Sequence, residues 1–504
     1  MEMYTAARTL PGVIEAACVM ATELNKDLLR VRGLLPEHIA AGPDDLLIIL
    51  QGEDSGALDT ALRVMDDSLS TRAAVPADSL TQSDSSAPRS LDRALGRLAG
   101  ANVALISVPG AYAAAEAARA LQRGLHVHLF SDNVTIEDEL ALKRLAHERE
   151  LLLMGPDCGT AILNGAPLGF ANIVRRGPVG IVGASGTGIQ QATVLLDRLG
   201  VGISHAIGVG GRDLSAAVGG LMTLDALDML EQDAATGCIL LISKPPAAET
   251  LGQVLDRVRT SNKPVVVCFL GADPAALAGV EYGATIEDAV LLAAGHVGAP
   301  TDPDDRYTES SMVEAERRRL QPTQRYVRGL YVGGTLADEA MLILSSVLGP
   351  INSNVPLPGR GTRLLNAAES LGNAVVDLGD DEFTQGRPHP MIDPLLRNER
   401  ISREARDREV AVLLCDVVLG LGSHPDPAGV LANALRRVRS QVDSGAEHPF
   451  PAVVASVCGT PGDPQQLDRQ EQVLREAGVR VMRSNAKAAR VAAAIASSYR
   501  EVLS

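Results

Sequence analysis

Apolar runs of strand length alternate with helical patterns through the middle of the chain. From residue 102 onward, the runs NVALISV, VHLF and LLLMG are separated by helical segments at 113–123 and 136–149. The alternation restarts at residue 177 with the runs PVGIVG, SHAIGVG, GCILLIS and KPVVVCFLG, and helical spacing covers residues 187–199, 224–234, 247–261 and 285–295. Strands that alternate with helices predict parallel, doubly wound sheets, here a Rossmann-like domain followed by one of flavodoxin type.

Both ends of the chain contain further units. Near the N-terminus, the apolar runs Ala16–Met20 and Leu46–Leu50 adjoin helical patterns, and five apolar residues between 58 and 69 recur at helical spacing. These features predict a small α+β module. After residue 325, the runs VRGLYVG, NAVVDLG, EVAVLLCDVVLG, FPAVVASVCG and VRVM predict a third α/β domain.

Two stretches without periodicity divide these units. Residues 76–90 are rich in Ser, Asp, Ala and Pro, and residues 300–324 are polar and charged, so both predict linkers. The fold class expected is α/β, with tandem parallel, doubly wound domains and a small N-terminal module. The expected segments are a module at 1–75, a linker at 76–90, a Rossmann-like domain at 91–170, a flavodoxin-type domain at 171–299, a linker at 300–324 and an α/β domain at 325–504.

Composition and charge limit the classes of partner that are expected for this chain. A chain of 504 residues with 46% hydrophobic residues can bury several cores. Its net charge of −16 would repel a phosphate backbone, so no nucleic-acid partner is expected. Neither an 18-residue apolar run nor a signal-peptide pattern is present, so we expect a cytoplasmic protein without a membrane segment. The six cysteines form no CxxC pair, which argues against zinc and against a disulfide framework.

The strand-to-helix turns are the natural ligand sites, because helix starts offer free N–H groups and a positive dipole end. The best candidate is the glycine-rich turn GASGTGIQQA, residues 183–192, which directly follows the run PVGIVG. There Gly186 and Gly188 allow close backbone approach to a ligand, and Ser185 or Thr187 can cap the helix or donate to phosphate. An ordinary capped turn explains the pattern equally well, so both interpretations stay open.

Two cations are expected at the same edge of the sheet. The turn GVGGRDLS, residues 208–215, places Arg212 beside Gly210 and Gly211, and Lys244 ends the next strand in ISKPPA. Each cation alone is explained by solvation. Together with the glycine-rich helix start they predict an anion site.

The third domain has comparable turns. In GLGSHPDPAG, residues 420–429, Gly422, Ser423 and Asp426 stand between strand and helix, and Asp426 before Pro427 is already explained as a helix cap. His424 is a candidate ligand or acid/base group, although a loop histidine is more often solvated. Similar turns are GGTLADEA, residues 333–340, and CGTPGDPQQ, residues 458–466, where Asp463 is expected to cap.

A polar, proline-rich segment at 379–394, GDDEFTQGRPHPMIDP, is typical of a functional loop and supplies Arg387 and His389. Asp380, Asp381 and His389 match no metal-binding spacing, so no metal is expected. The sequence contains neither GxxxxGK[ST] nor GxSxG, which excludes a P-loop NTPase and a serine-hydrolase elbow.

The central third of the chain resembles the succinyl-CoA synthetase α subunit. MGPDCGTAILNG (154–165) and RRGPVGIVGASGTGIQQATVLLDRLGVGISHAIGVGGRD (175–213) are similar to its GPNC-type segment, Ser-Gly-Thr helix start and VGxGG turn, and the third domain resembles the carboxy-terminal domain of the β subunit. Four further segments are similar to the FdrA family and span the chain: LPGVIEAACVMATELNKDLL, DLGDDEFTQGRPHPMIDP, DVVLGLGSHPDPA and VCGTPGDPQ.

Departures from the synthetase limit what the resemblance implies. The synthetase carries phosphate on a histidine in a GHAG-type segment, whereas residues 268–290 here contain no histidine, and Lys244 stands where the synthetase has a supporting acid. The ATP-grasp segment is missing, and the N-terminal module replaces the glycine-rich CoA-binding start. Phosphohistidine chemistry and nucleotide binding are therefore not expected, and CoA is a weaker candidate ligand than phosphate.

The resemblance to FdrA implies a subunit of oxamate carbamoyltransferase in allantoin breakdown, which works with companion subunits in an oligomer. This activity interconverts oxalurate plus phosphate and oxamate plus carbamoyl phosphate. In the synthetase, two helix starts face one phosphate, so by analogy Ser185–Gly188 and Gly422–Asp426 would do so here.

The same resemblance implies roles for the candidate residues. Ser185, Thr187, Arg212 and Lys244 would bind phosphate or carbamoyl phosphate. Arg387, His389 and His424 would bind the acceptor or move protons. Two alternatives stay open: an acyl-CoA synthetase that works with an ATP-grasp partner, and a non-catalytic scaffold that binds a small anion.

Overall fold

The computed structural model describes residues 10–31, 34–36, 39–42, 45–73, 88–299, 306–384, 387–445 and 448–497. The chain forms two compact units. Unit 1 comprises residues 1–94 together with 381–389, and unit 2 comprises residues 95–380 and 390–504. Most of the segment expected to be a functional loop therefore belongs with the N-terminal module.

Unit 1 is a small α+β module, as predicted. Its two strands are antiparallel, with Met20 opposite Leu46. Asn25, which is buried, donates from Nδ2 to the carbonyl of Met20 at 2.8 Å and so ties the first helix to the first strand. Its elements are β1 (Val13–Met20), α2 (Glu23–Val31), β2 (Leu46–Gly52), α3 (Ser55–Ala73) and the short α13 (Asp381–Thr384).

The first sheet of unit 2 has three parallel strands in the order β3-β4-β5. Helices cross over between the strands, which gives the Rossmann-like arrangement that the alternating pattern predicts. The elements are α4 (Leu91–Arg97), β3 (Val103–Ile106), α5 (Gly110–Gln122), β4 (His126–Leu129), α6 (Ile136–Glu148) and β5 (Leu153–Met154).

The second sheet has seven strands in the order β12-β11-β10-β8-β9-β6-β7. The five parallel strands β8 to β12 have the flavodoxin order, which confirms the predicted type. Its strands are β6 (Thr160–Leu163), β7 (Ala166–Gly169), β8 (Arg176–Gly183), β9 (Ile203–Gly208), β10 (Cys238–Ser243), β11 (Val265–Phe269) and β12 (Glu281–Tyr282). Its helices are α7 (Gly186–Arg198), α8 (Leu221–Gln232), α9 (Ala248–Arg259), α10 (Ile286–His296) and the 3-10 helix η1 (Pro274–Leu277).

The expected boundary at residue 170 is too late. Strands β6 and β7 form an antiparallel hairpin, and Ile162 of β6 pairs with Ala206 of β9. Residues 160–169 therefore extend the second sheet rather than the first, because a hairpin can add to an open edge without a crossover helix.

The third sheet is all parallel, in the order β15-β14-β16-β13-β17-β18-β19. Its strands are β13 (Tyr326–Tyr331), β14 (Ile351–Ser353), β15 (Gly361–Arg363), β16 (Ala374–Asp377), β17 (Val410–Val418), β18 (Ala452–Cys458) and β19 (Arg480–Met482). Its helices are α11 (Arg306–Arg319), α12 (Gly334–Leu348), α14 (Leu395–Glu404), α15 (Pro427–Gly445), α16 (Leu467–Glu476) and α17 (Asn485–Ala496). The sequence did not predict β14 and β15, which are too short to show a period.

Helix α11 lies where a linker was expected at 300–324. Glu316 accepts from Arg319 at 2.6 Å and pairs with Arg480 at 2.7 Å, and Arg317 donates from Nε to the carbonyl of Ala494 at 2.7 Å. Ion pairs and hydrogen bonds attach this charged helix in addition to the apolar side chains of Met312 and Val313, and its high charge explains why its pattern was mistaken for a linker. Residues 300–305, and residues 74–87 around the first expected linker, lie outside the described part of the chain.

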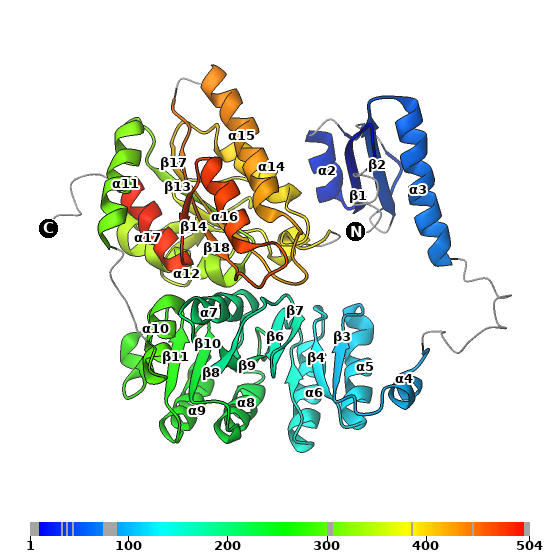
Figure 1. Ribbon diagram of the computed structural model, residues 1–504, viewed down its shortest axis with the longest axis vertical. Helices are drawn as coiled ribbons and strands as arrows, with labels where there is room; N and C mark the ends of the chain where they lie inside the picture. Colours follow the sequence, from blue (N-terminus) through cyan, green and yellow to red (C-terminus); the bar gives the residue numbers. More distant parts are fainter. Residues whose placement is uncertain are drawn as a thin grey trace. The chain divides into compact units, whose positions relative to one another are not determined.

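Helices that cover one face of the second sheet pack against helices that cover one face of the third sheet within unit 2. Helices α7 and α10 cover one face of the second sheet, α12 and α17 cover one face of the third, and α7 packs against α12 (Figure 1). A single hydrophobic core includes Ile189 of α7, Leu336 of α12 and Ala489 of α17. Among the described residues, no helix is long and apolar enough to cross a membrane.

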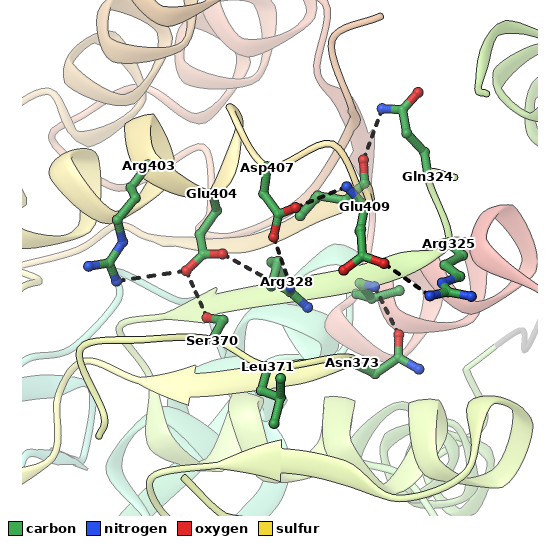
Figure 2. Close-up of polar contacts among 12 residues, drawn as sticks. Gln324, Arg325, Arg328, Ser370, Leu371, Asn373, Arg403, Glu404, Asp407 and Glu409 are labelled. Carbon is green, nitrogen blue, oxygen red and sulfur yellow. Dashed lines mark hydrogen bonds and ion pairs between the residues drawn. The ribbon is translucent and has the colours of Figure 1, made fainter. Parts of the chain in front are cut away.

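A buried ion-pair network lies beside β13 in the third sheet (Figure 2). Arg328 is 2% exposed and contacts Glu404 and Asp407, each at 3.1 Å. Glu404 also accepts from Arg400 Nε and from Ser370 Oγ, both at 2.7 Å. The carboxylate of Glu404 thus balances two buried guanidinium groups.

We expect Glu404→Gln to lower the free energy of unfolding by about 3 kcal/mol, because it leaves the buried guanidinium of Arg400 without its carboxylate partner and removes one of the two carboxylates beside Arg328. The measurement is the urea midpoint followed by circular dichroism. The matched control is Glu409→Gln, which removes the surface pair with Arg325, 3.0 Å apart with both side chains at least half exposed (Figure 2). That variant should leave the midpoint unchanged. Equal shifts of the urea midpoint in the two variants would contradict the role of Glu404 as a buried counter-ion.

Candidate anion-binding site

The glycine-rich turn after β8 carries a side-chain cap for helix α7, which one of the two interpretations predicted. Ser185 precedes α7, and its Oγ accepts from the N–H of Gly188 at 3.0 Å. A Cβ on Gly188 would lie 2.6 Å from that same oxygen, and a Cβ on Gly183 would lie 2.5 Å from Ile189. Packing therefore requires both glycines. Gly186 is different, because a Cβ there would meet nothing closer than 3.5 Å.

A small cavity of about 100 Å³ opens at this helix start. Three glycine-rich segments border it, at 157–160, 183–186 and 208–211. It therefore brings together Ser185, Gly186, Gly210 and Gly211, as the sequence predicted. The volume suits one phosphoryl group or a few water molecules of about 30 Å³ each. Its described lining residues include Asp157 but neither Lys nor Arg.

The start of α12 meets the start of α7. The hydroxyl groups of Ser185 and Thr335 are hydrogen-bonded to each other, and a Cβ on Gly333 would lie 3.0 Å from the methyl group of Thr187. Among the described residues, no side chain caps the first turn of α12. Two helix N-termini from positions 150 residues apart thus lie side by side.

The second helix start is not the one expected from the resemblance. Residues 422–426 precede α15, which packs against α14 and α16 and lies away from α7 (Figure 1). The turn GGTLADEA, which precedes α12, takes that place instead. The sequence identified both turns but could not tell which face of the third sheet each following helix covers.

Buried carboxylates surround the start of α12. Asp416 of β17 accepts from the N–H groups of Val332 and Gly333, both at 2.8 Å. Asp377 of β16 accepts from Gly379 N–H at 2.9 Å, and its Oδ2 would lie 2.6 Å from a Cβ on Gly334. Burial raises the pKa of Asp416 to about 6 and that of Asp377 to about 7. Sequence analysis missed both residues, although each lies at or near the carboxyl end of a buried strand.

Lys244 reaches this junction but already has a partner. Its Nζ lies 2.8 Å from Oδ2 of Asp338 in α12, a residue that is 1% exposed. Burial lowers the pKa of Lys244, but Asp338, Asp377 and Asp380 outweigh that effect and raise it. Lys244 is therefore a protonated bridge between the second and third sheets, and its role in anion binding remains a prediction.

Arg212 lies outside the cavity lining. Its guanidinium donates to the carbonyl of Val134 at 2.8 Å and pairs with Glu139 at 2.7 Å. The buried Lys143 joins Glu139 and Asp213, both at 2.8 Å, and donates to the carbonyl of Val209 at 3.0 Å. These contacts hold the 208–213 turn on α6, so Arg212 supports the turn instead of facing the cavity as expected.

Side chains in the turn before α15 make hydrogen bonds with nearby residues. Asp426 accepts from Gly429 N–H at 3.3 Å and from Gln470 Nε2 at 2.8 Å, which confirms the capping interpretation. His424 accepts at Nδ1 from Asp426 N–H at 3.0 Å. Gly422 lies against Phe170, and the buried Ser423 Oγ has no hydrogen-bond partner among the described residues.

Arg387 and His389 belong to unit 1, whereas Ser185 and His424 belong to unit 2. Arg387 donates from Nε to Asn25 Oδ1 at 2.9 Å. Burial lowers the pKa of His389 to about 4, so its imidazole is neutral near pH 7. A neutral ring cannot hold an anionic acceptor by charge, and these two residues share no unit with the cavity.

Asp463 is a cross-link and not the cap that was expected. Its carboxylate accepts from Asn172 Nδ2 at 2.8 Å, from Ile173 N–H at 2.7 Å and from Thr460 N–H at 2.8 Å. Helix α16 begins after Gln466, without a side-chain cap. Asp463 therefore ties the third domain to the segment that precedes β8.

Three family models match the chain. A model described as CoA-ligase covers residues 330–495, one described as CoA binding domain covers 174–271, and one described as AllF, heavy metal-associated domain covers 1–86. The uncharacterized protein YahF of Escherichia coli is 46% identical over 485 residues, which are 95% of this chain and 92% of YahF. The chain belongs to the YahF family.

More distant relatives of this YahF-family chain are CoA ligases. The ADP-forming succinate–CoA ligase subunit alpha of Aquifex aeolicus is 34% identical over 178 residues, 34% of this chain and 57% of that protein. The resemblance to the synthetase α subunit is thereby confirmed for its domain type, while the narrower resemblance to FdrA stays a prediction. Among solved structures, a dinucleotide-forming acetyl-coenzyme A synthetase of Ca. Korarchaeum cryptofilum has a TM-score of 0.30 and 16% identity over 78% of this chain and 82% of that chain.

The residues present do not fit the heavy metal that the third family description implies. Residues 1–86 contain a single cysteine, Cys18, and a single histidine, His38. Soft metals take several thiolate or imidazole ligands. No group of three His, Cys, Asp or Glu residues that could hold a metal occurs among the described residues.

The cavity at the start of α7 does not fit the whole of CoA. It measures about 100 Å³, and its described lining lacks the Lys or Arg that the several phosphates of CoA would require. Backbone N–H groups at a helix start do suit a single phosphoryl group.

The carboxyl group of Asp377 makes stability depend on pH. Its pKa of about 7 in the folded chain exceeds the ordinary value of 3.8, so the folded state binds the proton more tightly than the unfolded state. Its contribution to stability is thus complete below about pH 4 and falls as the pH rises to about 7. We expect Asp377→Asn to gain stability relative to the parent protein between pH 5 and pH 8, measured as urea midpoints. If the difference between the urea midpoints of the variant and the parent did not change with pH, the raised pKa of Asp377 would be contradicted.

Proposed function

We propose that this chain is a subunit of an acyl-transferring enzyme of the CoA-ligase type, and that it binds the phosphoryl group of an acyl phosphate at the start of α7. The observation that carries the proposal is the meeting of the α7 and α12 N-termini through Ser185 and Thr335. Two positive dipole ends at one place favour an anion more than either alone. The CoA-binding and CoA-ligase family models cover the two domains that supply these helices.

The proposed chemistry uses backbone groups more than side chains. A nucleophile attacks the carbonyl carbon of the acyl phosphate, the bond between that carbon and the bridging oxygen breaks, and phosphate leaves. N–H groups of Gly186 and Thr187 stabilise the charge that develops on the departing phosphate. Asp377, with its pKa of about 7, is suited to accept the proton of the nucleophile. Residues 268–290 contain no histidine, so the scheme has no covalent phosphohistidine.

A narrower candidate is carbamoyl transfer between oxalurate and phosphate. The cavity of about 100 Å³ favours a small acyl group, and carbamoyl phosphate, the acyl phosphate of carbamic acid, has one. Here a phosphate oxygen attacks the ureido carbonyl, the carbon–nitrogen bond breaks, and the departing oxamate nitrogen takes a proton. Companion subunits would supply the missing acceptor site.

We expect Gly186→Ala to weaken the binding of inorganic phosphate at least about tenfold, a loss of about 1.4 kcal/mol. The added methyl group would lie 3.5 Å from Thr160 Oγ1 and 3.6 Å from Gly159 Cα, so it fits the fold while occupying the cavity. The measurement is a phosphorus NMR titration of the full chain. The matched control is Gly252→Ala in α9, where a Cβ would meet nothing within 4 Å. Equal affinity in both variants would refute the site.

Measuring phosphate release distinguishes CoA-dependent acyl transfer, carbamoyl transfer and a non-catalytic scaffold. The chain, purified with the partners that accompany it from its host, would receive acetyl phosphate or carbamoyl phosphate together with CoA, with oxamate, or with neither. Phosphate release that requires CoA supports ligase-type transfer, and release that requires oxamate supports the carbamoyl reaction. Phosphate binding without release under any condition would show a non-catalytic scaffold and overturn the proposed activity.

A further inference from the structure

A second, larger cavity of about 750 Å³ lies along the C-terminal half of α12. Its other walls are the segments that follow β11 and β12, the last turns of α17 and the loop before β15. All of these belong to unit 2. A cavity of this size is within the range of about 300–1,000 Å³ that is usual for small-molecule sites.

The walls of this α12 cavity are mainly apolar. Phe269 and Leu277 line it from the second sheet, Leu342 and Val347 from α12, and Ala493 from α17. Two hydroxyl groups in the lining, those of Thr285 and Ser346, already have internal partners. Thr285 Oγ1 accepts from Asp288 N–H at 3.1 Å, and Ser346 Oγ donates to the carbonyl of Ile343 at 2.7 Å.

Among the described residues of the lining, the charged side chains are positive: Arg360 and Arg490 line the α12 cavity, and none of the described lining residues is Asp or Glu. Arg490 is held by Glu287 at 3.4 Å and by Asp288 at 3.9 Å. Arg360 is exposed, and its guanidinium makes no ion pair or hydrogen bond with any described residue. Arg360 is therefore the charged group in this lining that is available to a ligand.

The α12 cavity is separate from the helix start that forms the anion site. Residues Leu342 to Val347 follow Gly334 by eight to thirteen positions. At about 1.5 Å per residue this places them about 12–20 Å farther along the axis of α12. The linings of the two cavities share no residue.

We propose that the α12 cavity is a binding site for an amphipathic monocarboxylate. Arg360 binds the carboxylate group through two parallel N–H···O contacts, the geometry that a guanidinium favours. The apolar body of the ligand lies against Phe269, Leu277 and Leu342, where its burial supplies most of the affinity. This site goes beyond the proposed acyl-phosphate chemistry and does not depend on it.

The test is isothermal titration of the full chain with octanoate, below its micelle concentration, alongside 1-octanol and acetate. We expect octanoate to bind at one site, and octanol and acetate each to bind at least about tenfold more weakly, because each lacks one of the two features recognised. Arg360→Ala should weaken octanoate at least tenfold without changing the affinity for octanol. The matched control, Arg363→Ala, alters an exposed arginine of β15 that is not in the lining and should leave octanoate binding unchanged.

A second variant tests the same site by adding a negative charge to its lining. Val347 is 46% exposed, so the fold should tolerate Val347→Glu. The added carboxylate should repel octanoate and favour octylamine. Equal affinities for octanoate and octanol, or unchanged octanoate binding in Arg360→Ala, would overturn the proposal. So would loss of octanoate binding in Gly186→Ala, which would place the ligand at the start of α7.

Discussion

The contact between the N-terminal ends of α7 and α12 is the constraint on which the rest of unit 2 depends. Two positive helix ends repel each other unless negative charge lies close by. Asp416 supplies such charge from β17, Asp377 in its ionised form adds to it from β16 on the other side of β13, and Asp338 is paired with Lys244. The second and third sheets share one hydrophobic core, and contacts from Asp463 to Asn172 and from Glu339 to Ile286 join the two domains.

The carboxylates that make this junction possible also compete with any anion that binds there. An ionised Asp377 beside Gly334 disfavours a second negative charge, whereas the protonated form does not. Anion binding and proton binding at this place are therefore thermodynamically coupled, and each promotes the other. Lys244 moderates the competition, because its ammonium neutralises Asp338. An anion bound here would therefore be selected by charge balance as well as by shape.

Sequence analysis recovered the parallel sheets and the cap at Ser185 because both depend on local pattern. The short strands β14 and β15 and the helix α11 escaped it, since none has an apolar period. The cations Arg212 and Lys244 were placed at the correct edge of the sheet, but their partners, Glu139 and Asp338, come from remote helices. The choice of α12 over α15 depended on which face of the third sheet each helix covers. Sequence spacing carries no information about that choice.

Both helix ends of the junction belong to one polypeptide. When two such halves are separate molecules, the assembled site is lost on dilution according to its dissociation constant. Covalent connection replaces that encounter by an intramolecular one, with an effective concentration on the order of millimolar for a flexible tether. Here the two halves also share a packed core, so they cannot exchange with copies from another molecule without unfolding. The assembly of the junction therefore does not depend on the concentration of the protein in the cell. Its two halves are always synthesised in equal number.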